Sequence, residues 1–406
     1  MRFLYNFALE NRNLLVLFAT GLLFWSSFAC LLPALPLYLA HHGATNQQIG
    51  IVMGCFAFGL LLFRTQFGQM ADKRGRKIVL LIGTLVGAIA PLGYLVIQSI
   101  PLLMVLRIFH GVSVAAFVPG FNALVVDIAP AHKRGEIIGY MNLVHSIGVA
   151  LGPALGGYIQ ATSNHTYLFL LSAGLSLISL LCAMQITDLK LEQQRQTQAS
   201  KFWQTLLSPR VRVPAEILLL VGLAVGTLNT FVPLYIKTTR VDLNIGLFYT
   251  AAAFSSFSVR LFIGKASDRM GRGLFITLSL ICYFLAMLFL WMAHNAQMFL
   301  IASSFEGAGG SILFTILASM MADRSSPHER GRIFALCIFG WDIGLTAAGP
   351  ICGYLAEQSG YRHMFGFNTL LTLIALFIFL TKSSKGFRNS LRFALGYGQD
   401  VYAVKS

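Results

Sequence analysis

Three charged side chains lie deep within long apolar stretches of the sequence, where they could bind or carry charge. Arg107 stands in the segment LRIFHGVSVAAF, and Glu306 and Asp342 are the two deepest acids. A charge at such a depth is costly, so it usually faces a partner or a water-filled cavity. Burial disfavours the ionised form of a carboxyl group, so either acid could bind a proton; each could equally be a fixed counter-ion for Arg107 or another cation. His145 is a further titratable candidate, although it could equally be a satisfied histidine in a packed core.

A glycine-rich motif follows the second apolar stretch and reads GQMADKRGRKIVL. Gly68 and Gly75 permit a tight turn between antiparallel helices, where a larger side chain would crowd the backbone. Asp72 can face the N-terminus of a neighbouring helix, whose dipole favours an anion, and Arg76 can reach Asp127. A degenerate copy, GKASDRMGRGLF, stands 196 residues later. Its corresponding residues are Gly264, Asp268, Gly271 and Arg272, and Asp127 returns as Asp323.

A third motif, GVALGPALGG, places small residues along one predicted helix. In lipid, small residues let two helices approach closely, and packing then drives their association. The proline removes a backbone hydrogen bond and introduces a kink. The motif therefore predicts a bent helix that packs tightly on a neighbour. Its defining residues are Gly148, Gly152, Pro153, Gly156 and Gly157.

The stretches that carry these motifs are long enough to cross a membrane. Of the 406 residues, 56% are hydrophobic and 11% are charged, whereas a soluble domain has about 25% charged residues. A spanning helix needs about 20 apolar residues, and the short alternating segments of a membrane β-barrel do not occur in this sequence. The sequence therefore predicts an all-α polytopic membrane protein. Its twelve predicted helices are 14–40, 46–70, 77–97, 100–126, 135–160, 165–186, 213–237, 243–267, 274–294, 297–322, 332–357 and 361–381.

The predicted helices form two homologous halves, because further residues repeat at the same offset. Arg64 returns as Arg260, Gly111 as Gly307, and Gly135 as Gly331. Parallel six-helix repeats are one architecture of secondary transporters. The last segment of the chain, residues 383–406, either lies on the anionic inner leaflet or is disordered. We predict two pseudo-symmetric six-helix bundles (1–186 and 213–382), a cytoplasmic linker (187–212) and a cytoplasmic tail (383–406).

The positive charge of the chain follows its membrane topology. Of the 30 Lys and Arg residues, 24 lie in one alternating set of predicted loops and tails, and the opposite set has Lys237, Arg240 and Arg362. By the positive-inside rule, both termini are expected in the cytoplasm, with the chain in the plasma (inner) membrane. The net charge of +15 therefore does not predict nucleic-acid binding.

The sequence lacks the patterns that several other classes of protein would require. The six cysteines lie within predicted helices without metal-site spacing. The phosphate-binding loop of an ATP-driven pump and the H-E-x-x-H and G-x-S-x-G motifs of hydrolytic enzymes do not occur. We therefore expect no metal, no cofactor and no enzymatic activity.

Over residues 10–385 the sequence resembles the major facilitator superfamily. The loop motif is similar to the family's G-x-L-A-D-R-x-G-R-K signature, with Met70 for the usual Leu and Lys73 for the usual Arg. GVALGPALGG is similar to the family's antiporter motif, and the Arg107 segment to its membrane-embedded Arg motif, with His110 for the more usual Gln. The resemblance implies that the loop motif latches the halves, that Arg107 takes part in proton coupling, and that a monomer exports substrate by rocking of the halves.

The nature of the substrate is less constrained. The first helix lacks the acid that many multidrug antiporters of this family carry, which weakens a cationic-drug specificity and leaves room for sugars, siderophores or other metabolites. Proton-coupled export of small amphiphilic compounds or metabolites across the lipid bilayer is the leading hypothesis. An uptake symporter or facilitator, a transporter-like sensor and a lipid-moving protein remain alternatives. The residues expected to line a central cavity are Trp25, Phe28, Asn122, Asn142, Asn229, Phe231 and Trp341.

Overall fold

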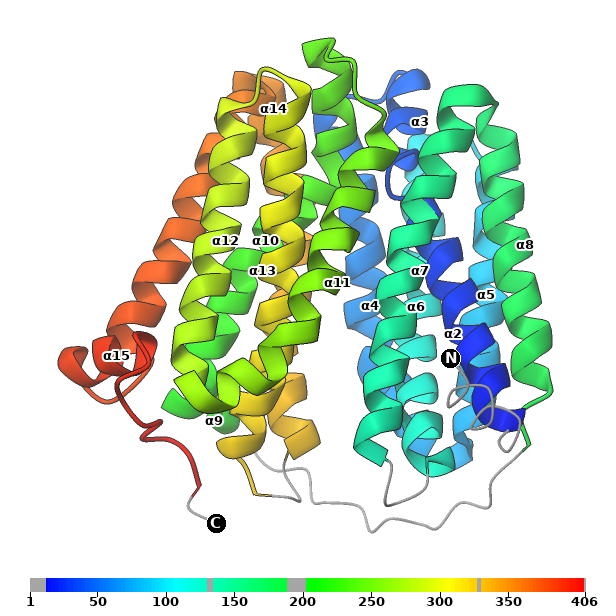
Figure 1. The fold of residues 1–406 in the computed structure, drawn as a ribbon. Helices are drawn as coiled ribbons and strands as arrows, with labels where there is room; N and C mark the ends of the chain where they lie inside the picture. The colour runs from blue at the N-terminus through cyan, green and yellow to red at the C-terminus, as the bar shows by residue number, and fades with distance from the viewer. Residues whose placement is uncertain (1–11, 130–133, 188–201, 327–329, 405–406) are drawn as a thin grey trace. The chain divides into compact units, whose positions relative to one another are not determined.

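The structure is a computed structural model, and it describes residues 12–129, 134–187, 202–326 and 330–404 (Figure 1). All regular elements within these ranges are helices. In chain order they are α2 (Arg12–Cys30), α3 (Leu35–His41), α4 (Asn46–Arg74), α5 (Arg76–Val96), α6 (Ile100–Ile128), α7 (Arg134–Thr162), α8 (His165–Met184), α9 (Phe202–Leu206), α10 (Pro209–Thr239), α11 (Ile245–Met270), α12 (Arg272–Met292), α13 (Ala296–Asp323), α14 (Arg330–Lys382) and α15 (Phe387–Ala394).

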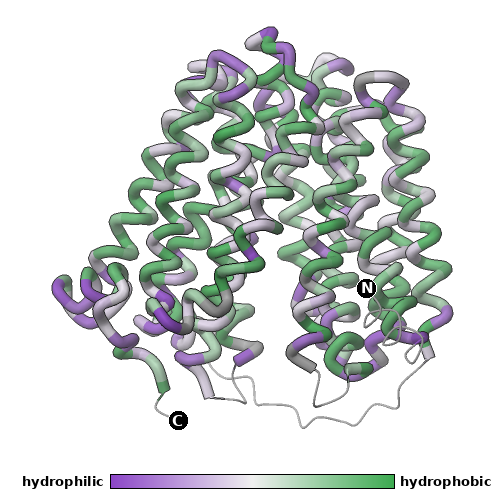
Figure 2. Tube along the Cα trace, viewed as in Figure 1, coloured by the Kyte–Doolittle hydropathy of each residue, from purple (hydrophilic) through white to green (hydrophobic). Residues whose placement is uncertain are grey.

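Eleven helical segments of the described chain are long and apolar enough to cross a membrane. Apolar residues run along these segments, and hydrophilic residues gather toward their ends (Figure 2). The longest segment, Ile333–Lys382, contains the last two predicted spans. Gly360 separates them, because its φ of 80° breaks the helical geometry inside α14. This conformation is accessible to glycine at little cost, so the two spans join without a loop.

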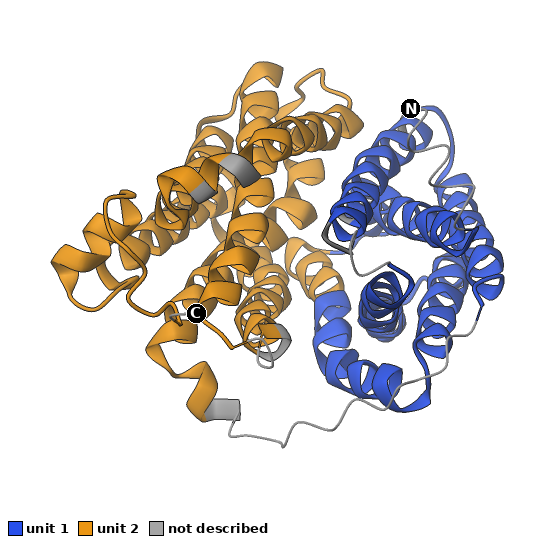
Figure 3. Cartoon of the chain, turned by 60° about the horizontal axis from the view of Figure 1, so that its bottom comes forward, with its two compact units in different colours: residues 1–44, 55–197 blue, residues 45–54, 198–406 orange. Residues whose placement is uncertain are grey.

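The chain divides into two compact units, coloured separately in Figure 3. Unit 1 holds residues 1–44 and 55–197. Within it α2 packs on α7 and α8, and α5 packs on α6 and α8. Aromatic rings fill part of its core: Phe24 stacks on Phe117 with ring centroids 3.7 Å apart, and Phe117 stacks on Phe121 at 5.1 Å. Unit 1 thus has a hydrophobic core of its own.

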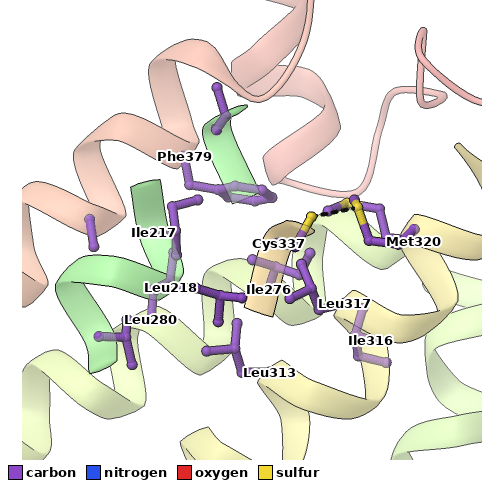
Figure 4. Packing of buried hydrophobic residues seen from close by; sticks show 14 of the residues in the cluster. Ile217, Leu218, Ile276, Leu280, Leu313, Ile316, Leu317, Met320, Cys337 and Phe379 are labelled. Carbon is purple, nitrogen blue, oxygen red and sulfur yellow. Dashed lines mark hydrogen bonds between the residues drawn. The ribbon is translucent and has the colours of Figure 1, made fainter. Parts of the chain in front are cut away.

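Unit 2 holds residues 45–54 and 198–406. Within it α10 packs on α14, and α13 packs on α11 and α12. Figure 4 shows part of its core, in which Ile217, Leu280, Leu313 and Phe379 are almost fully buried. The Cys337 thiol donates to the Met321 sulfur at 3.2 Å, so this cysteine fills apolar space.

The start of α4 belongs to unit 2, although the sequence predicted one bundle over residues 1–186. Gly50 and Gly349 bring α4 and α14 so close that a Cβ on either would collide with the backbone of the other. The Tyr361 hydroxyl also donates to Asn46 Oδ1 at 2.6 Å. Small residues at a helix crossing permit this approach, which moves the boundary of the compact unit.

The C-terminal segment is also part of unit 2. Helix α15 packs on α12 and α14, and the structure follows the chain from there to Val404. This packing argues against the alternative, left open by the sequence, that the tail is disordered. The predicted boundary at residue 382 separates two parts that pack together.

Candidate functional site

Arg107 lies in unit 1 on α6 and is 4% exposed. Its guanidinium carbon stands 4.6 Å above the centre of the Phe56 ring, which is a cation–π contact. It also forms a side-chain hydrogen bond with Tyr94 of α5. The Tyr94 hydroxyl is 3.0 Å from Nδ1 of His110, one turn along α6. These aromatic and polar partners hold the buried cation at one position in the helix bundle.

The backbone also supports this cluster. The Tyr38 hydroxyl donates to the Tyr94 carbonyl oxygen at 3.0 Å. A Cβ at Gly111 would collide with the carbonyl oxygen of Phe56, so only glycine lets α6 and α4 cross here. The Phe56 ring meets the His110 ring edge-on at 5.4 Å. Arg107 is therefore contacted from α4 and α5, and α3 supports the backbone of Tyr94.

A second group of side chains lies on α2 and α7 of unit 1. The Trp25 ring meets the His145 ring edge-on at 4.3 Å and the Phe28 ring at 6.0 Å. Trp25 and Phe28 are half-buried, and His145 is exposed. The exposure of His145 argues against the alternative that it is a core histidine. Two of the predicted cavity residues and one predicted titratable residue are thus brought together.

The glycine motif of α7 packs on α2, as its spacing predicts. A Cβ at Gly148 would lie 2.7 Å from the Trp25 Cβ, and one at Gly152 would lie 2.7 Å from the Ala29 Cβ. At Gly156 a Cβ would collide with the Cys30 carbonyl oxygen. Gly157 and Pro153 are buried in the same helix. The motif therefore sets the distance between α2, which carries Trp25, and α7, which carries His145.

The first loop motif forms an ion pair at the junction of α4, α5 and α6. Gly75 has a φ of 115° and precedes α5, so the turn needs a glycine. Arg76, the first residue of α5, pairs with Asp127 near the end of α6, and their side chains are 21% and 19% exposed. Asp72 is exposed, and a Cβ at Gly68 would meet open space. The contact between Arg76 and Asp127 that the sequence indicated is therefore present.

The second copy of the motif forms the equivalent pair in unit 2. Gly271 has a φ of 90° and precedes α12. The Nε of Arg272 is 2.5 Å from Asp323 Oδ2, and its Nη2 donates to Oδ1 at 3.2 Å. The surroundings of Gly264 and the side chain of Asp268 lie outside the described residues. Both copies thus join the first residue of one helix to an acid at the end of the next.

The two candidate proton carriers lie apart on different helices of unit 2. Glu306 on α13 is half-buried and interacts electrostatically with Tyr249 of α11 and Tyr283 of α12. Asp342 on α14 is 2% exposed, and its carbonyl oxygen accepts a hydrogen bond from the Thr346 hydroxyl at 2.8 Å. The acids therefore have different surroundings, which is the physical basis for giving them different roles.

The remaining predicted cavity residues do not form one group. Trp341 is half-buried on α14 and meets Phe314 edge-on at 4.8 Å. Phe231 is fully buried, with its ring 6.2 Å from that of Tyr361, so it is a packing residue in this structure. Asn229 is half-buried and Asn122 is exposed, while the side chain of Asn142 lies outside the described residues.

Sequence reasoning missed Tyr94, which is hydrogen-bonded to Arg107, and Tyr249 and Tyr283, which interact electrostatically with Glu306. A tyrosine in an apolar stretch is too common to stand out, and only the fold shows which charge it meets. It also missed Arg324, which directly follows Asp323. The signal for Arg324 was present, because the corresponding residue of the first half, 196 positions earlier, is Ile128.

Comparisons with known proteins agree with this architecture. The family model of the Major Facilitator Superfamily matches residues 17–296 and 217–394. The quinolone resistance protein NorA of Staphylococcus aureus is 26% identical over 235 residues, which cover 55% of this chain and 58% of NorA. The aligned region therefore spans less than two thirds of NorA. An uncharacterised transporter of the same superfamily from Methanocaldococcus jannaschii is 22% identical over 377 residues, covering 90% of this chain and 96% of the relative.

Solved structures share the fold at low sequence identity. The nucleoside transporter NupG superposes with a TM-score of 0.77 at 14% identity, covering 90% of this chain and 98% of NupG. A bacterial homologue of the human lysosomal transporter Spinster superposes with a TM-score of 0.73 at 13% identity, covering 96% and 98%. These likenesses confirm the predicted all-α fold. With the family match over most of its length, this chain is a multi-pass membrane protein that belongs to the Major Facilitator Superfamily.

Proposed function

We propose that this protein is a secondary active transporter that exports small amphiphilic compounds or metabolites in exchange for protons. The observation that carries the proton-coupled part is the placement of Asp342, an acid that is 2% exposed inside a membrane-spanning helix. A carboxylate in such a position is costly and is usually functional. Export, rather than uptake, is supported by the similarity to the quinolone resistance protein NorA. Membership of a transporter family supports the absence of enzymatic activity.

The mechanism we propose is alternating access. Protonation of a buried acid removes its charge and changes the relative stability of two arrangements of the protein. A change of a few pKa units, at about 1.4 kcal/mol each, is enough to bias such an equilibrium. The pairs Arg76–Asp127 and Arg272–Asp323 are proposed as gates, as the family resemblance implies; each lies within one unit and fixes two helix ends there. Arg107 is proposed to take part in proton coupling.

The test is a transport assay in proteoliposomes that contain a pH-sensitive dye. Substrate is selected first from labelled dyes, sugars and siderophores by comparing accumulation in cells with and without a protonophore. We expect substrate movement to drive proton movement in the opposite direction. Asp342→Asn and Glu306→Gln should differ, with one abolishing coupled transport and the other changing only the affinity. Asp242→Asn, at an exposed position between α10 and α11, is the matched control.

The result that would overturn the proton-carrier assignment is wild-type coupling in both variants. Movement of protons and substrate in the same direction would instead identify a symporter, and movement without protons a facilitator. The assay thus separates the proposal from the uptake alternatives. The absence of any substrate flux would favour a sensor or a lipid-moving protein.

The orientation and assembly are part of the proposal. The charge distribution of the sequence supports cytoplasmic termini in a plasma (inner) membrane. Because the two halves of one chain carry the complete set of motifs, we propose that a monomer is the transporting unit. Labelling of single cysteines at residues 163 and 385 with a membrane-impermeant reagent tests the orientation. Reaction of residue 385 in intact cells would contradict cytoplasmic termini.

A further inference from the structure

The C-terminal tail follows a defined path across the end of unit 2. Figure 1 shows α15 beside one end of α12 and α14, with the chain turning back after it. The Thr277 hydroxyl donates to the Ala394 carbonyl oxygen at 2.8 Å, which ties α12 to the end of α15. Farther along, the Val404 amide donates to the Asp323 carbonyl oxygen at 2.8 Å. The tail thus contacts both helices that supply the second gate pair.

Arg324 is the centre of this docking and is 1% exposed. Its Nε and Nη2 donate to the two carboxylate oxygens of Asp400 at 2.6 and 3.1 Å. Its Nη1 donates to the Arg210 carbonyl oxygen at 3.1 Å, and Nη2 also donates to that of Ser383 at 3.2 Å. The guanidinium faces the Tyr402 ring at 5.1 Å. A two-pronged pair with further acceptors is what allows a buried guanidinium to remain charged.

Two differences between the sequence halves coincide with this docking. At the offset of 196 residues, Arg324 corresponds to Ile128, and Gly273 corresponds to Lys77. A Cβ at position 273 would collide with the Phe393 carbonyl oxygen, so a lysine there would exclude the tail. The second half therefore has a glycine in place of a lysine and an arginine in place of an isoleucine at the two places where the tail contacts it.

We propose that the tail, residues 383–404, is a fixed component of the second gate, with Arg324 and Asp400 as its positioning residues. It holds the end of α13, which carries Asp323, against the start of α12, which carries Arg272. Two neighbouring attachments do this: Arg324 is bound to Asp400, and the backbone of Asp323 is bound to Val404. This inference rests on the proposed gating function of the Arg272–Asp323 pair.

The experiment measures amide hydrogen exchange in the full-length protein in lipid nanodiscs. Asp400→Asn leaves the buried charge of Arg324 without its anionic partner, which is strongly destabilising. We expect exchange in residues 387–404 and at the end of α13 to become about tenfold faster or more. Arg388→Gln removes a positive charge from an exposed position of α15 and is the matched control, with unchanged exchange.

A second pair of variants tests the attachment to Asp323 without disturbing a buried charge. Val404→Pro removes the amide hydrogen that binds the Asp323 carbonyl oxygen, whereas Val404→Ala keeps it. Val404 is 52% exposed, so neither change affects the core. We expect faster exchange at the end of α13 in Val404→Pro alone. This pair keeps the inference testable if Asp400→Asn fails to fold.

A transport assay tests whether the tail positions the gate residues or only stabilises the fold. We expect Asp400→Asn and Val404→Pro to lower the maximal transport rate by about twofold to fivefold, with a half-saturating substrate concentration within about twofold of wild type. Asp400→Glu, which keeps the charge, should recover part of the rate. Release of the tail without faster exchange at the end of α13 would overturn the inference. So would an unchanged rate. Because amide hydrogen exchange is measured without substrate, failure of the proposed proton-coupled export would leave the amide-exchange result intact.

Discussion

Helices α6 and α13 occupy equivalent places in the two halves but carry opposite chemistry. Arg107 and His110 on α6 correspond, at the offset of 196, to Ser303 and Glu306 on α13. The contacts that hold the two helices are equivalent as well. A Cβ at Gly111 would collide with the Phe56 carbonyl oxygen, and a Cβ at Gly307 would collide with that of Ala252, the corresponding residue.

This difference shows that the helix crossing and the charge on it are separate properties. The glycine contact depends on the backbone, so it repeats in both halves. The side chains on the same helices differ between the halves, with Arg107 and His110 on α6 and Ser303 and Glu306 on α13. Both charged residues nevertheless interact with tyrosines: Arg107 is hydrogen-bonded to Tyr94, and Glu306 interacts electrostatically with Tyr249 and Tyr283. We expect the shared scaffold to respond equally to mutation in both halves and the diverged residues to respond differently.

The largest effect is expected when the shared crossing is broken. Gly111→Leu and Gly307→Leu each force a side chain against a carbonyl group, so the helices must separate. We expect a loss of at least about 3 kcal/mol in either half, since overpacking a tight contact costs about 1–3 kcal/mol and a backbone clash more. Thermal unfolding in detergent measures it. Gly139→Ala, where a Cβ meets open space, is the control.

Similar losses in the two glycine variants would support an equivalent scaffold. A stable Gly307→Leu protein beside an unstable Gly111→Leu protein would contradict the equivalence of the crossings. It would show that α13 can shift relative to α11 where α6 cannot shift relative to α4.

The next effect concerns the charges themselves. Arg107→Ala removes the buried cation and should reduce proton-coupled transport by about 100-fold or more, while Arg107→Lys keeps the charge and should retain a small fraction of activity. Glu306→Gln keeps the shape of the side chain but cannot release a proton. We expect substrate exchange at equilibrium to persist in Glu306→Gln if Glu306 is the carrier, with net proton flux lost.

Assays of net proton flux and of substrate exchange therefore distinguish two roles for Glu306, proton carriage and substrate binding. Loss of both net flux and exchange in Glu306→Gln would show that Glu306 is needed for substrate binding. In that outcome Asp342 would remain the candidate carrier, and the contrast between α6 and α13 would concern substrate rather than protons.

A smaller effect is expected from the tyrosines. Tyr94→Phe removes the hydroxyl between Arg107 and His110 but keeps the ring. A hydrogen bond to a charged group contributes about 1.5–3 kcal/mol, so a rate loss of about tenfold or more is expected if the bond positions Arg107 for transport. Tyr249→Phe removes the hydroxyl of a tyrosine that interacts electrostatically with Glu306. Initial rates at saturating substrate measure both, and wild-type rates in Tyr94→Phe would show that the Tyr94 hydroxyl is not needed to position Arg107.

Much of this architecture could be predicted from the sequence because its signals are periodic or repeated. The lengths of the apolar stretches predicted the spans, and the 196-residue offset indicated both ion pairs, Arg76–Asp127 and Arg272–Asp323. Glycine spacing in α7 predicted a close helix neighbour, since small residues on one helix face permit close approach. That the neighbour is α2 is known only from the structure. These are properties of local sequence and of symmetry, which one chain contains in full.

The rest depends on contacts between residues far apart in the chain. Phe231 was predicted to line the cavity from its depth in a helix, yet its rotation within the bundle buries it. The start of α4 was assigned to the first half by position, whereas a Gly50–Gly349 approach places it in unit 2. The docking of the tail depends on Arg324, a charge that looked like one more residue of a basic loop. Helix rotation, crossings and buried pairs of this kind have no periodic signal.

The smallest expected effect concerns the gate pairs, where the halves differ in their surroundings. The Arg76–Asp127 pair is about one fifth exposed, and the Arg272–Asp323 pair is 26% and 40% exposed. Partly exposed ion pairs are worth about 0–1 kcal/mol, so losing one should shift a two-state equilibrium by at most about fivefold. In Asp323→Asn the end of α13 is still held by the tail, because Val404 and Asp400 bind the backbone of residue 323 and Arg324. In the first half, the residue that corresponds to Arg324 is Ile128, whose apolar side chain forms no such ion pair.

We therefore expect Asp127→Asn to have the larger effect on the population of the two states, measured by the labelling rate of a single cysteine placed near each of the two ion pairs. Combining Asp323→Asn with Val404→Pro should remove the difference. If Asp323→Asn alone already equals or exceeds Asp127→Asn, the tail does not support the second gate, and the lower exposure of the first pair has no energetic consequence.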